Sequence, residues 1–453
     1  MLRLLDFHNN REKRVESMLP LWLWLCLLLG GASQGGAIAN SVLQVGGAAL
    51  IALWLWNGTR LNIRQDEHIP FYLLIAALVW IAIMFVPLPP TIWQLLPGRD
   101  FVAEGYRLLG MKLPWLSMAM APDRALRSAL VLLVPIATWL LVRRMDQTSR
   151  RRMAMGIAVI AAISAAIGLL QMSTGPNSVL RLYSPTNQDS PVGFFANTNH
   201  FSLFLACSLP LAAAWVATVD TRKPAKRKLL LGLCIFAALV ATALIVGKSV
   251  AGLAFLVLGL IGTAHILWSR FASGRHKLVF VTGVITAALI AVAALTAIGT
   301  GTLGAKFENA PTSRSNMTPV TISAGTDMAP TGSGLGSFAQ VYAMHQPDRF
   351  TTTTWVNHAH NDYAELYLEL GFPGLILVAI FLVWFLLQGY RIWQQRDDPN
   401  MLFAQAAWLS GSFMLLHSIV DYPLRTAAMA ALFAAMIGLL YGSKKSDLGC
   451  SER

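Results

Sequence analysis

The stretch NHAHNDYAELYLELG at residues 357–371 places several proton-handling side chains beside a long apolar run. Histidine titrates near neutral pH, so His358 or His360 could accept a proton from a hydroxyl group that acts as a nucleophile. Asn361 follows His360 directly and could hold the imidazole ring or a substrate oxygen. The alternative is an ordinary helix start at a membrane surface, solvated and without chemical activity.

Three carboxylates follow these histidines. A helix that begins near Asp362 would place this carboxylate in its first turn, where the positive end of the helix dipole stabilises a negative charge. Glu365 and Glu369 are four positions apart and would share one face of the helix. Carboxylates at the edge of a membrane need partners, and the basic residues outside the cytoplasmic loops are the natural ones. We expect Glu365 and Glu369 to support the site or to contact a glycan.

Three further segments combine polar or glycine residues with adjacent apolar runs. Amides at a helix start can cap the helix or bind sugar hydroxyls, and closely spaced glycines form a turn or wrap a ligand. A histidine and an aspartate four positions apart could support the site. The residues are Asn197, Asn199 and His200 in GFFANTNHF, Gly334 and Gly336 in GSGLGSF, and His417, Asp421 and Arg425 in HSIVDYPLR.

Three basic side chains could bind the oxygens of a diphosphate. Arg181 and Arg314 offer planar guanidinium groups, and Lys248 offers a point charge between two apolar runs. If Lys248 lies only at the membrane interface, it can extend its ammonium into water without any such role. His358 and His360 form a weak metal pattern because no third histidine or cysteine accompanies them, so we expect neither a metal nor another cofactor.

The composition predicts an all-α, polytopic integral membrane protein. The chain has 453 residues, of which 55% are hydrophobic and 13% charged, whereas soluble proteins carry about a quarter charged residues. Apolar runs of about 18–22 residues are long enough for a hydrocarbon layer of roughly 30 Å. About twelve transmembrane helices are expected, near residues 19–37, 39–56, 70–88, 125–142, 153–172, 199–218, 229–247, 249–268, 278–298, 366–389, 401–420 and 424–441.

The distribution of basic residues predicts the orientation of these helices. With a cytoplasmic N-terminus, roughly two thirds of the lysines and arginines lie on the cytoplasmic side, as the positive-inside rule requires. The net charge of +13 therefore reflects membrane topology and does not indicate nucleic acid. The expected organisation is a cytoplasmic tail at 1–18, helices 1–9 within 19–298, a large outer loop at 299–365 that carries site residues, helices 10–12 within 366–441 and a cytoplasmic tail at 442–453.

The order of the motifs resembles the O-antigen ligase and O-antigen polymerase-related membrane glycosyltransferases. HAHNDYAELYLELGFPG is similar to the signature that follows the large periplasmic loop of that family. GFFANTNHFSLFLA resembles the family's Asn-x-Asn-His helix start, and SGLGSF resembles its glycine segment. VPLPPTIWQLLPGR, APDRALRSAL and HSIVDYPLRTAA look like its exopolysaccharide-associated members. The resemblance covers roughly residues 70–440.

This resemblance implies a bacterial inner-membrane protein whose site faces the periplasm. Such proteins transfer a glycan from undecaprenyl pyrophosphate to an acceptor sugar hydroxyl, with inversion and without a metal. The family's general base would fall on His360, with His358 as the alternative, and an arginine ahead of the glycine segment would fall on Arg314. Two departures stand out: Lys248 and Ser249 occupy the place of a Ser-Arg-Gly sequence, and the stretch after Arg314 is rich in threonine and proline.

The acceptor and the type of transfer stay open at this level. The resemblance implies a saccharide or a lipid A-core as acceptor and membrane lipid as surroundings, and it fits either ligation of a finished polymer or polymerisation of repeat units. Twelve spans would also suit a flippase for lipid-linked glycans or another transporter. A transporter should place ionisable groups near the middle of the bilayer, often in broken helices. In this sequence they lie at the outer membrane boundary, which favours the enzyme.

Overall fold

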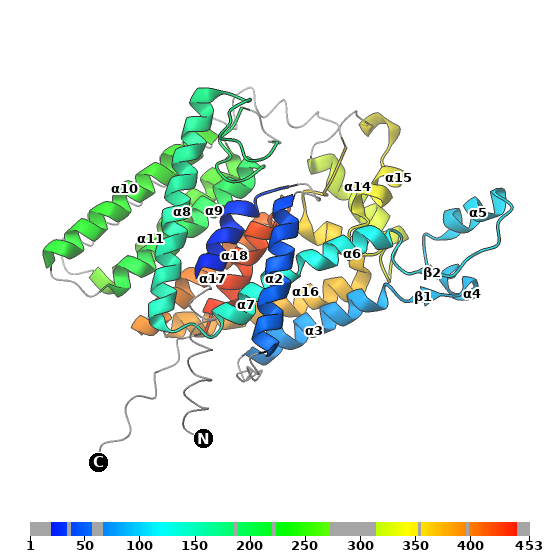
Figure 1. The fold of residues 1–453 in the computed structure, drawn as a ribbon, viewed down its shortest axis with the longest axis horizontal. Helices are drawn as coiled ribbons and strands as arrows, with labels where there is room; N and C mark the ends of the chain where they lie inside the picture. Colours follow the sequence, from blue (N-terminus) through cyan, green and yellow to red (C-terminus); the bar gives the residue numbers. More distant parts are fainter. Residues whose placement is uncertain are drawn as a thin grey trace, which may run out of the picture.

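Helices make up nearly all of the regular structure in this computed structural model, which describes residues 20–33, 38–56, 67–184, 189–219, 223–247, 249–271, 314–351, 355–395 and 398–441 (Figure 1). The longer helices are α2 (Ile38–Trp56), α3 (His68–Ile83), α6 (Pro122–Val131), α7 (Leu133–Val142), α8 (Gln147–Thr174), α9 (Thr198–Thr218), α10 (Lys223–Gly247), α11 (Val250–Phe271), α14 (Arg314–Asp327), α16 (Asp362–Gln394), α17 (Leu402–His417) and α18 (Ala427–Leu439). The short elements are β1 (Pro87–Leu88), α4 (Pro90–Trp93), α5 (Asp100–Leu108), β2 (Leu116–Ser117), α15 (Phe338–His345) and the 3-10 turns η2 (Asp348–Phe350), η3 (Pro399–Met401) and η4 (Pro423–Arg425).

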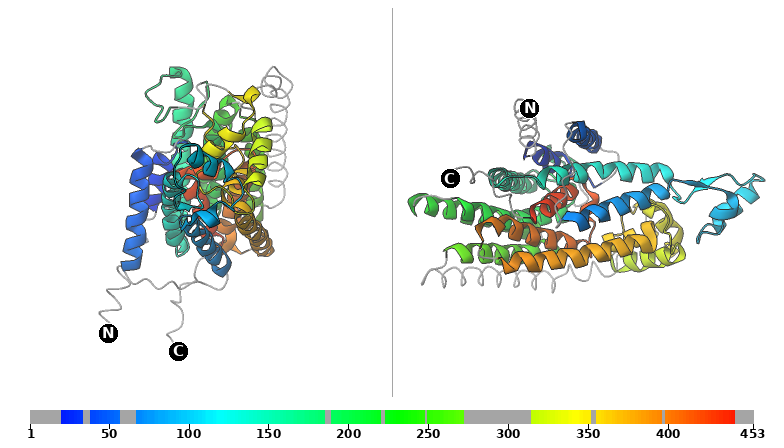
Figure 2. Two further views of the ribbon diagram at one scale, coloured as in Figure 1. Left: turned by 90° about the vertical axis from the view of Figure 1, so that its right-hand side faces the viewer. Right: turned by 90° about the horizontal axis from the view of Figure 1, so that it is seen from below.

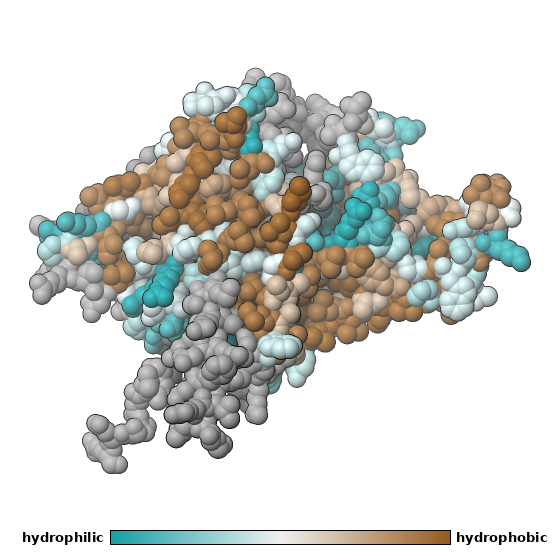
Figure 3. Space-filling model, in the orientation of Figure 1, coloured by the Kyte–Doolittle hydropathy of each residue, from teal (hydrophilic) through white to brown (hydrophobic). Residues whose placement is uncertain are grey.

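Many of these helices have the length and composition of membrane spans. Within the described residues, seven are long and apolar enough to cross a membrane, namely Ile38–Trp56, Pro122–Val142, Gln147–Thr174, Thr198–Thr218, Pro224–Gly247, Val250–Trp268 and Asp362–Gln394. Shorter apolar helices occur at Pro20–Leu29, His68–Ile83 and Ala427–Leu439. Large apolar side chains cover much of the outside of the bundle, as expected where lipid is the solvent (Figure 3).

The expected number of twelve spans is not confirmed. Several segments expected as full spans form shorter helices. Helix α3 has 16 residues, α17 has 16 and α18 has 13. The span expected at 278–298 lies outside the described residues. Within the loop expected at 299–365, the described part contains α14 and α15, so the threonine- and proline-rich stretch after Arg314 is helical.

Helix α9 forms the centre of the bundle. It packs against α8, α10, α11 and α17, and 89% of its span is buried. The sequence explains this placement, because Phe201–Ala214 is apolar or small on every side and a helix of that kind must be surrounded by others (Figures 1 and 2). The starts of α9 and α16 lie at the same end of the bundle, because Asn199 and Asp362 both hydrogen-bond to the loop after α17.

A kink in α16 forms the surface against which the glycine segment, GSGLGSF at residues 332–338, packs. Gly371 has φ 64°, and Pro373 follows it, so the backbone leaves the helical ladder between the two halves of α16. The carbonyls freed by this break accept hydrogen bonds from Ser333 N at Leu368 O (2.9 Å), Gly334 N at Glu369 O (2.8 Å) and Trp80 Nε1 at Leu370 O (3.1 Å). The GFPG sequence and the glycine segment therefore form one structural unit.

Candidate active site

The loop that precedes α16 holds the two candidate histidines. Asn361 caps the helix, since its side-chain oxygen accepts from Tyr363 N at 3.1 Å and Ala364 N at 3.0 Å. His360 has φ 51° and is the only residue other than glycine with positive φ among those the structure describes. This left-handed conformation costs an L-residue roughly 1–2 kcal/mol, so contacts around His360 must hold it there.

Asp421 is the direct partner of His360. The distance from His360 Nδ1 to Asp421 Oδ1 is 3.0 Å. A carboxylate can only accept, so Nδ1 carries the proton and Nε2 keeps the lone pair that a general base needs. The His360 side chain is 25% exposed, whereas the Asp421 side chain is fully buried. This arrangement orients an accessible imidazole by means of a buried carboxylate.

Two more histidines and an amide surround the same carboxylate. His417 Nε2 lies 3.6 Å from Asp421 Oδ2, and His200 Nε2 lies 4.0 Å from Oδ1. Asn199 Nδ2 donates to Oδ2 at 2.6 Å. Burial alone would raise the pKa of Asp421, but contacts with His360 and His417 and the neighbouring His200 outweigh burial and hold that pKa well below its usual range. Asp421 is therefore ionised at neutral pH and able to fix the His360 tautomer.

Tyr422 separates the histidines from one another. Its ring centroid lies 4.3 Å from that of His358, 4.8 Å from that of His360 and 5.0 Å from that of His200. The side chain is almost fully buried, and burial together with the Asp421 charge raises the pKa of its hydroxyl to about 12. Tyr422 is thus a neutral aromatic spacer that fixes the ring positions of three histidines.

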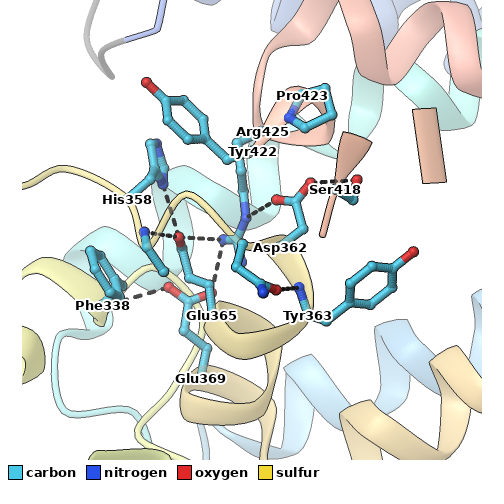
Figure 4. Close-up of polar contacts among 12 residues, drawn as sticks. Phe338, His358, Asp362, Tyr363, Glu365, Glu369, Ser418, Tyr422, Pro423 and Arg425 are labelled. Carbon is cyan, nitrogen blue, oxygen red and sulfur yellow. Dashed lines mark hydrogen bonds and ion pairs between the residues drawn. The ribbon is translucent and has the colours of Figure 1, made fainter. Parts of the chain in front are cut away.

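A second cluster forms around Arg425, in η4 (Figure 4). The guanidinium Nη1 lies 2.8 Å from Glu369 Oε2 and 3.3 Å from Glu365 Oε1, and Nε lies 3.5 Å from Asp362 Oδ1. Asp362 Oδ2 also accepts from Ser418 Oγ at 2.8 Å. One arginine therefore contacts all three carboxylates that the first turns of α16 carry, and it ties α16 to the loop after α17.

Glu365 connects this cluster to the histidine loop. Its Oε1 lies 2.8 Å from His358 Nδ1, and its Oε2 accepts from Ala359 N at 2.8 Å (Figure 4). Both carboxylate oxygens of Glu365 therefore contact the loop that precedes α16 and hold it in place. His358 has the same tautomer as His360 by the same argument, but its carboxylate partner is shared with Arg425.

Of the predicted cation sites, only Arg181 has a described side chain. It lies in the loop between α8 and α9, where Nη1 donates to Ser190 O at 3.2 Å. Desolvation lowers its pKa, and Asp189 acts in the opposite direction. Lys248 lies outside the described residues, and Arg314 opens α14 with a side chain that is not described. Roles for these three in binding a diphosphate stay predictions.

Ser249, beside Lys248, marks where the start of α11 meets this site. Ser249 Oγ donates to Asn199 Oδ1 at 3.0 Å, and Asn199 in turn donates to Asp421. A chain of hydrogen bonds therefore runs from α11 through α9 to Asp421 and His360. The sequence pointed to Ser249 only through the resemblance, where Lys248 and Ser249 occupy the place of a Ser-Arg-Gly sequence, and it did not predict the contact with Asn199.

The remaining predicted residues have structural positions of clear physical origin. Asn197 caps α9 by accepting from Asn199 N at 2.8 Å. Gly334 and Gly336 have φ 102° and 76°, and a Cβ at either position would lie within 3 Å of Ala119 or Arg124 backbone atoms. Glycine is therefore required there for close packing, and contacts of these residues with a glycan stay predictions.

The sequence missed Ser418 as a part of the site. Tyr422 was signalled by its place in HSIVDYPLR, between the predicted Asp421 and Arg425. Ser418 has no such signal, because its contact with Asp362 joins positions 56 residues apart. Among the described residues, no group of three or more His, Cys, Asp or Glu side chains is arranged to hold a metal ion.

Residues 234–379 match the family model for O-antigen ligase. The chain carries an O-antigen ligase domain. The match spans about a third of the 453 residues and includes His358, His360 and Glu365. Asp421 and Arg425 lie beyond the matched range, yet the structure brings both into contact with O-antigen ligase domain residues. No curated protein matches the chain.

The family gives the activity and the substrates in general terms. An O-antigen ligase domain indicates an enzyme that transfers glycans, and it implies lipid-linked glycan substrates. The apolar helices around the domain indicate a multi-pass membrane protein. The site built by His360, Asp421 and Arg425 stands where α9, α11 and α16 begin, at one end of these helices.

Proposed function

We propose that this protein transfers a glycan from undecaprenyl pyrophosphate to an acceptor sugar hydroxyl, with His360 as the general base. The observation that carries the proposal is the His360 Nδ1 to Asp421 Oδ1 contact of 3.0 Å, which favours the neutral tautomer with its proton on Nδ1 and its lone pair on Nε2 of a partly exposed ring. Positioned general bases of this kind contribute roughly 10²–10⁴-fold to a reaction rate. His358 is the alternative base.

The proposed step balances as a single displacement. The acceptor oxygen forms a bond to the anomeric carbon while the bond from that carbon to the phosphate oxygen breaks, which inverts the configuration. The hydroxyl proton goes to His360 Nε2, and undecaprenyl pyrophosphate leaves with the electron pair of the broken bond. The diphosphate gains negative charge in this step, and we assign Arg314, Lys248 and Arg181 to stabilise it. Arginine and lysine charges make a metal ion unnecessary in this scheme.

The proposed setting is the bacterial inner membrane, with the site facing the periplasm. The excess of lysine and arginine in the opposite loops supports this orientation. The acceptor is either a lipid A-core or the growing end of a polysaccharide, because the proposed chemistry at His360 is the same for ligation and polymerisation.

The test compares glycan transfer by the wild type and His360→Gln in lipid nanodiscs. The donor is undecaprenyl-pyrophosphate-linked glycan from the host, and a chelator is added in a parallel reaction. His345→Gln is the matched control, because His345 Nε2 forms a comparable pair with Asp327 Oδ2 (3.2 Å) on α14 and α15. We expect His360→Gln to lose at least 10²-fold in kcat and the control to keep full activity.

Full activity of His360→Gln would move the base to His358, which His358→Gln would test. Loss of transfer on chelation would overturn the metal-free scheme. The product length then separates the two types of transfer, since ligation attaches one block and polymerisation yields a ladder. If no form transfers glycan but lipid-linked glycan crosses vesicle membranes, the protein is a transporter.

A further inference from the structure

An arm formed by residues 87–117 projects from the bundle at the end where the candidate site lies (Figures 1 and 2). Strands β1 and β2 pair at its base, with Pro87 opposite Ser117 and Leu88 opposite Leu116. The arm is a folded unit, because Trp93 is buried within it and donates to Pro114 O at 2.9 Å. It contains α4 and α5 and follows directly on α3.

Arg99 attaches the arm to the rest of the protein. Its Nη2 donates to Met118 O at 2.6 Å and to Gly332 O at 3.3 Å, and the side chain is buried. Burial lowers the pKa of Arg99 to about 10, which leaves the guanidinium charged at neutral pH. The position of the arm is therefore coupled to the glycine segment that sits in the kink of α16.

The arm exposes an unusual amount of apolar side chain for its size. Aliphatic and aromatic residues with half or more of their surface open include Leu95 (81%), Leu108 (79%), Leu109 (73%), Trp115 (65%) and Met111 (55%). A soluble surface would leave such residues scattered singly, whereas these five lie within 21 positions. Figure 3 shows hydrophobic surface on the arm beside hydrophilic residues.

This apolar surface continues that of α3. The exposed apolar residues of α3 and its end recur every three or four positions and so form one stripe along the helix, and Ile92 and Leu95 come next along the chain. Figure 3 shows this continuous hydrophobic surface below and to the left of the arm. The stripe consists of Ile69, Tyr72, Ile75, Val79, Ile83 and Val86.

We infer that the arm lies in the boundary between lipid head groups and acyl chains, with its apolar surface in contact with phospholipid. Its continuity with the α3 stripe identifies lipid as the occupant. Trp115 is the residue type enriched at this depth, and the neighbouring Arg107 and Lys112 can reach the head groups. Short amphipathic elements of this composition bury their apolar side about 5–10 Å into the boundary.

The consequence is a fixed depth for the site. Because Arg99 joins the arm to Gly332 and Met118, lipid contact by the arm holds the glycine segment and the α16 kink at a set height relative to the membrane surface. This inference rests on the exposed side chains and the helical bundle, and it does not depend on glycan transfer.

The test places an environment-sensitive fluorophore on the arm of the full-length protein in nanodiscs of phosphatidylethanolamine and phosphatidylglycerol. Cys234 and Cys450 are replaced by serine, and Cys26 and Cys207 are buried and do not label. Single cysteines are then introduced as Leu95→Cys and Leu108→Cys for the arm. Ile75→Cys on α3 is the lipid control, and Asp348→Cys in the exposed turn η2 is the aqueous control.

Fluorescence is quenched either by lipids with a nitroxide near the head group or by iodide in water. We expect both arm labels to be quenched by the nitroxide lipids several-fold more than the label at Asp348, and by iodide several-fold less. Arm labels that behave like Asp348 would overturn the inference. Protection from both quenchers would also overturn it, because that result indicates contact with a protein, and crosslinking between two copies would then identify a second chain as the occupant.

Discussion

Asp421 and Arg425 lie four positions apart on one loop and are the centres of two opposite clusters. Arg425 is a single cation among three carboxylates, and Asp421 is a single carboxylate among three histidines. In the arginine cluster, ion pairs of 2.8–3.5 Å join three buried carboxylates to one guanidinium whose side chain is 16% exposed. In the histidine cluster, the His200 and His417 side chains are fully buried, and the His360 side chain is 25% exposed.

We infer from this difference that the arginine cluster is structural and that the histidine cluster belongs to the proposed chemistry. The histidine cluster brings one partly exposed ring, that of His360, onto a buried carboxylate that orients it, which is the arrangement that a general base needs. Arg425 holds the carboxylates of Asp362, Glu365 and Glu369 and offsets part of their negative charge. Asp421 sets the tautomer of His360, and the two roles are divided between neighbouring residues.

The largest effect should come from Asp421→Asn. An amide can donate to His360 Nδ1, which would put the proton on Nε2 and remove the base. We expect kcat for glycan transfer to fall by about 10³–10⁴-fold with little change in KM, by analogy with the effect of an Asp→Asn change in a Ser-His-Asp triad. The measurement is the initial rate of transfer in nanodiscs at saturating donor.

Asp327→Asn serves as the control, because Asp327 pairs with His345 outside the cluster. A fall in kcat of less than tenfold for Asp421→Asn would contradict the distinction between the two clusters, because Asp421 would then have only a structural role, like Arg425. The acid response gives a further check. The Asp421 pKa is lowered in the folded state, so its stabilisation is present above the unfolded value of about 4 and is lost as pH falls through the native value.

The starts of individual helices could be predicted from the sequence, but the meeting of three histidines around Asp421 could not. The start of α16 near Asp362 follows from the residue types, whereas Asn361, expected to hold the imidazole ring or a substrate oxygen, caps the helix instead. Helix α9 begins and ends within one residue of the expected span 199–218. His200, His360 and His417 belong to three segments that meet only through tertiary packing. The sequence carries no local signal for that meeting, nor for the shortening of α17 and α18.

Arg425→Gln should have the second largest effect, and on stability. It leaves three buried carboxylates without a cation, and removing one partner of a buried ion pair typically costs about 3–5 kcal/mol. We expect a large drop in the thermal unfolding midpoint in detergent, because α16 loses its ion pairs with the loop after α17 and keeps only hydrogen bonds such as that between Asp362 and Ser418.

Arg107→Gln is the matched control for this change. Arg107 pairs with Glu104 at 3.4 Å on the exposed arm, where such pairs contribute about 0–1 kcal/mol. A midpoint for Arg425→Gln that equals the midpoint of this control would show that the arginine cluster is not structural. Normal stability with abolished transfer would instead assign Arg425 to the donor diphosphate.

Glu365→Gln should produce an intermediate effect that appears in both measurements. The amide keeps the shape but removes a charge from Arg425 and one of two acceptors that hold His358 and Ala359. We expect about 1–3 kcal/mol of destabilisation, as for a buried group left unpaired, and roughly tenfold lower kcat because the loop that carries His360 loosens. Lower stability with unchanged kcat would confine Glu365 to the arginine cluster.

Ser249→Ala should give the smallest effect and shows how far the histidine cluster extends. Ser249 Oγ donates to Asn199 at 3.0 Å and also accepts from Gly252 N at 3.1 Å as a helix cap. Loss of the cap costs about 1 kcal/mol. Asp146→Ala removes the cap of α8 at the far end of the bundle and measures that cost alone. We expect both variants to lose similar stability and only Ser249→Ala to lose several-fold in kcat, because Asn199 then holds Asp421 less firmly. Equal kcat values in the two variants would show that the Ser249–Asn199 hydrogen bond does not affect catalysis. The start of α11 would then not belong to the histidine cluster.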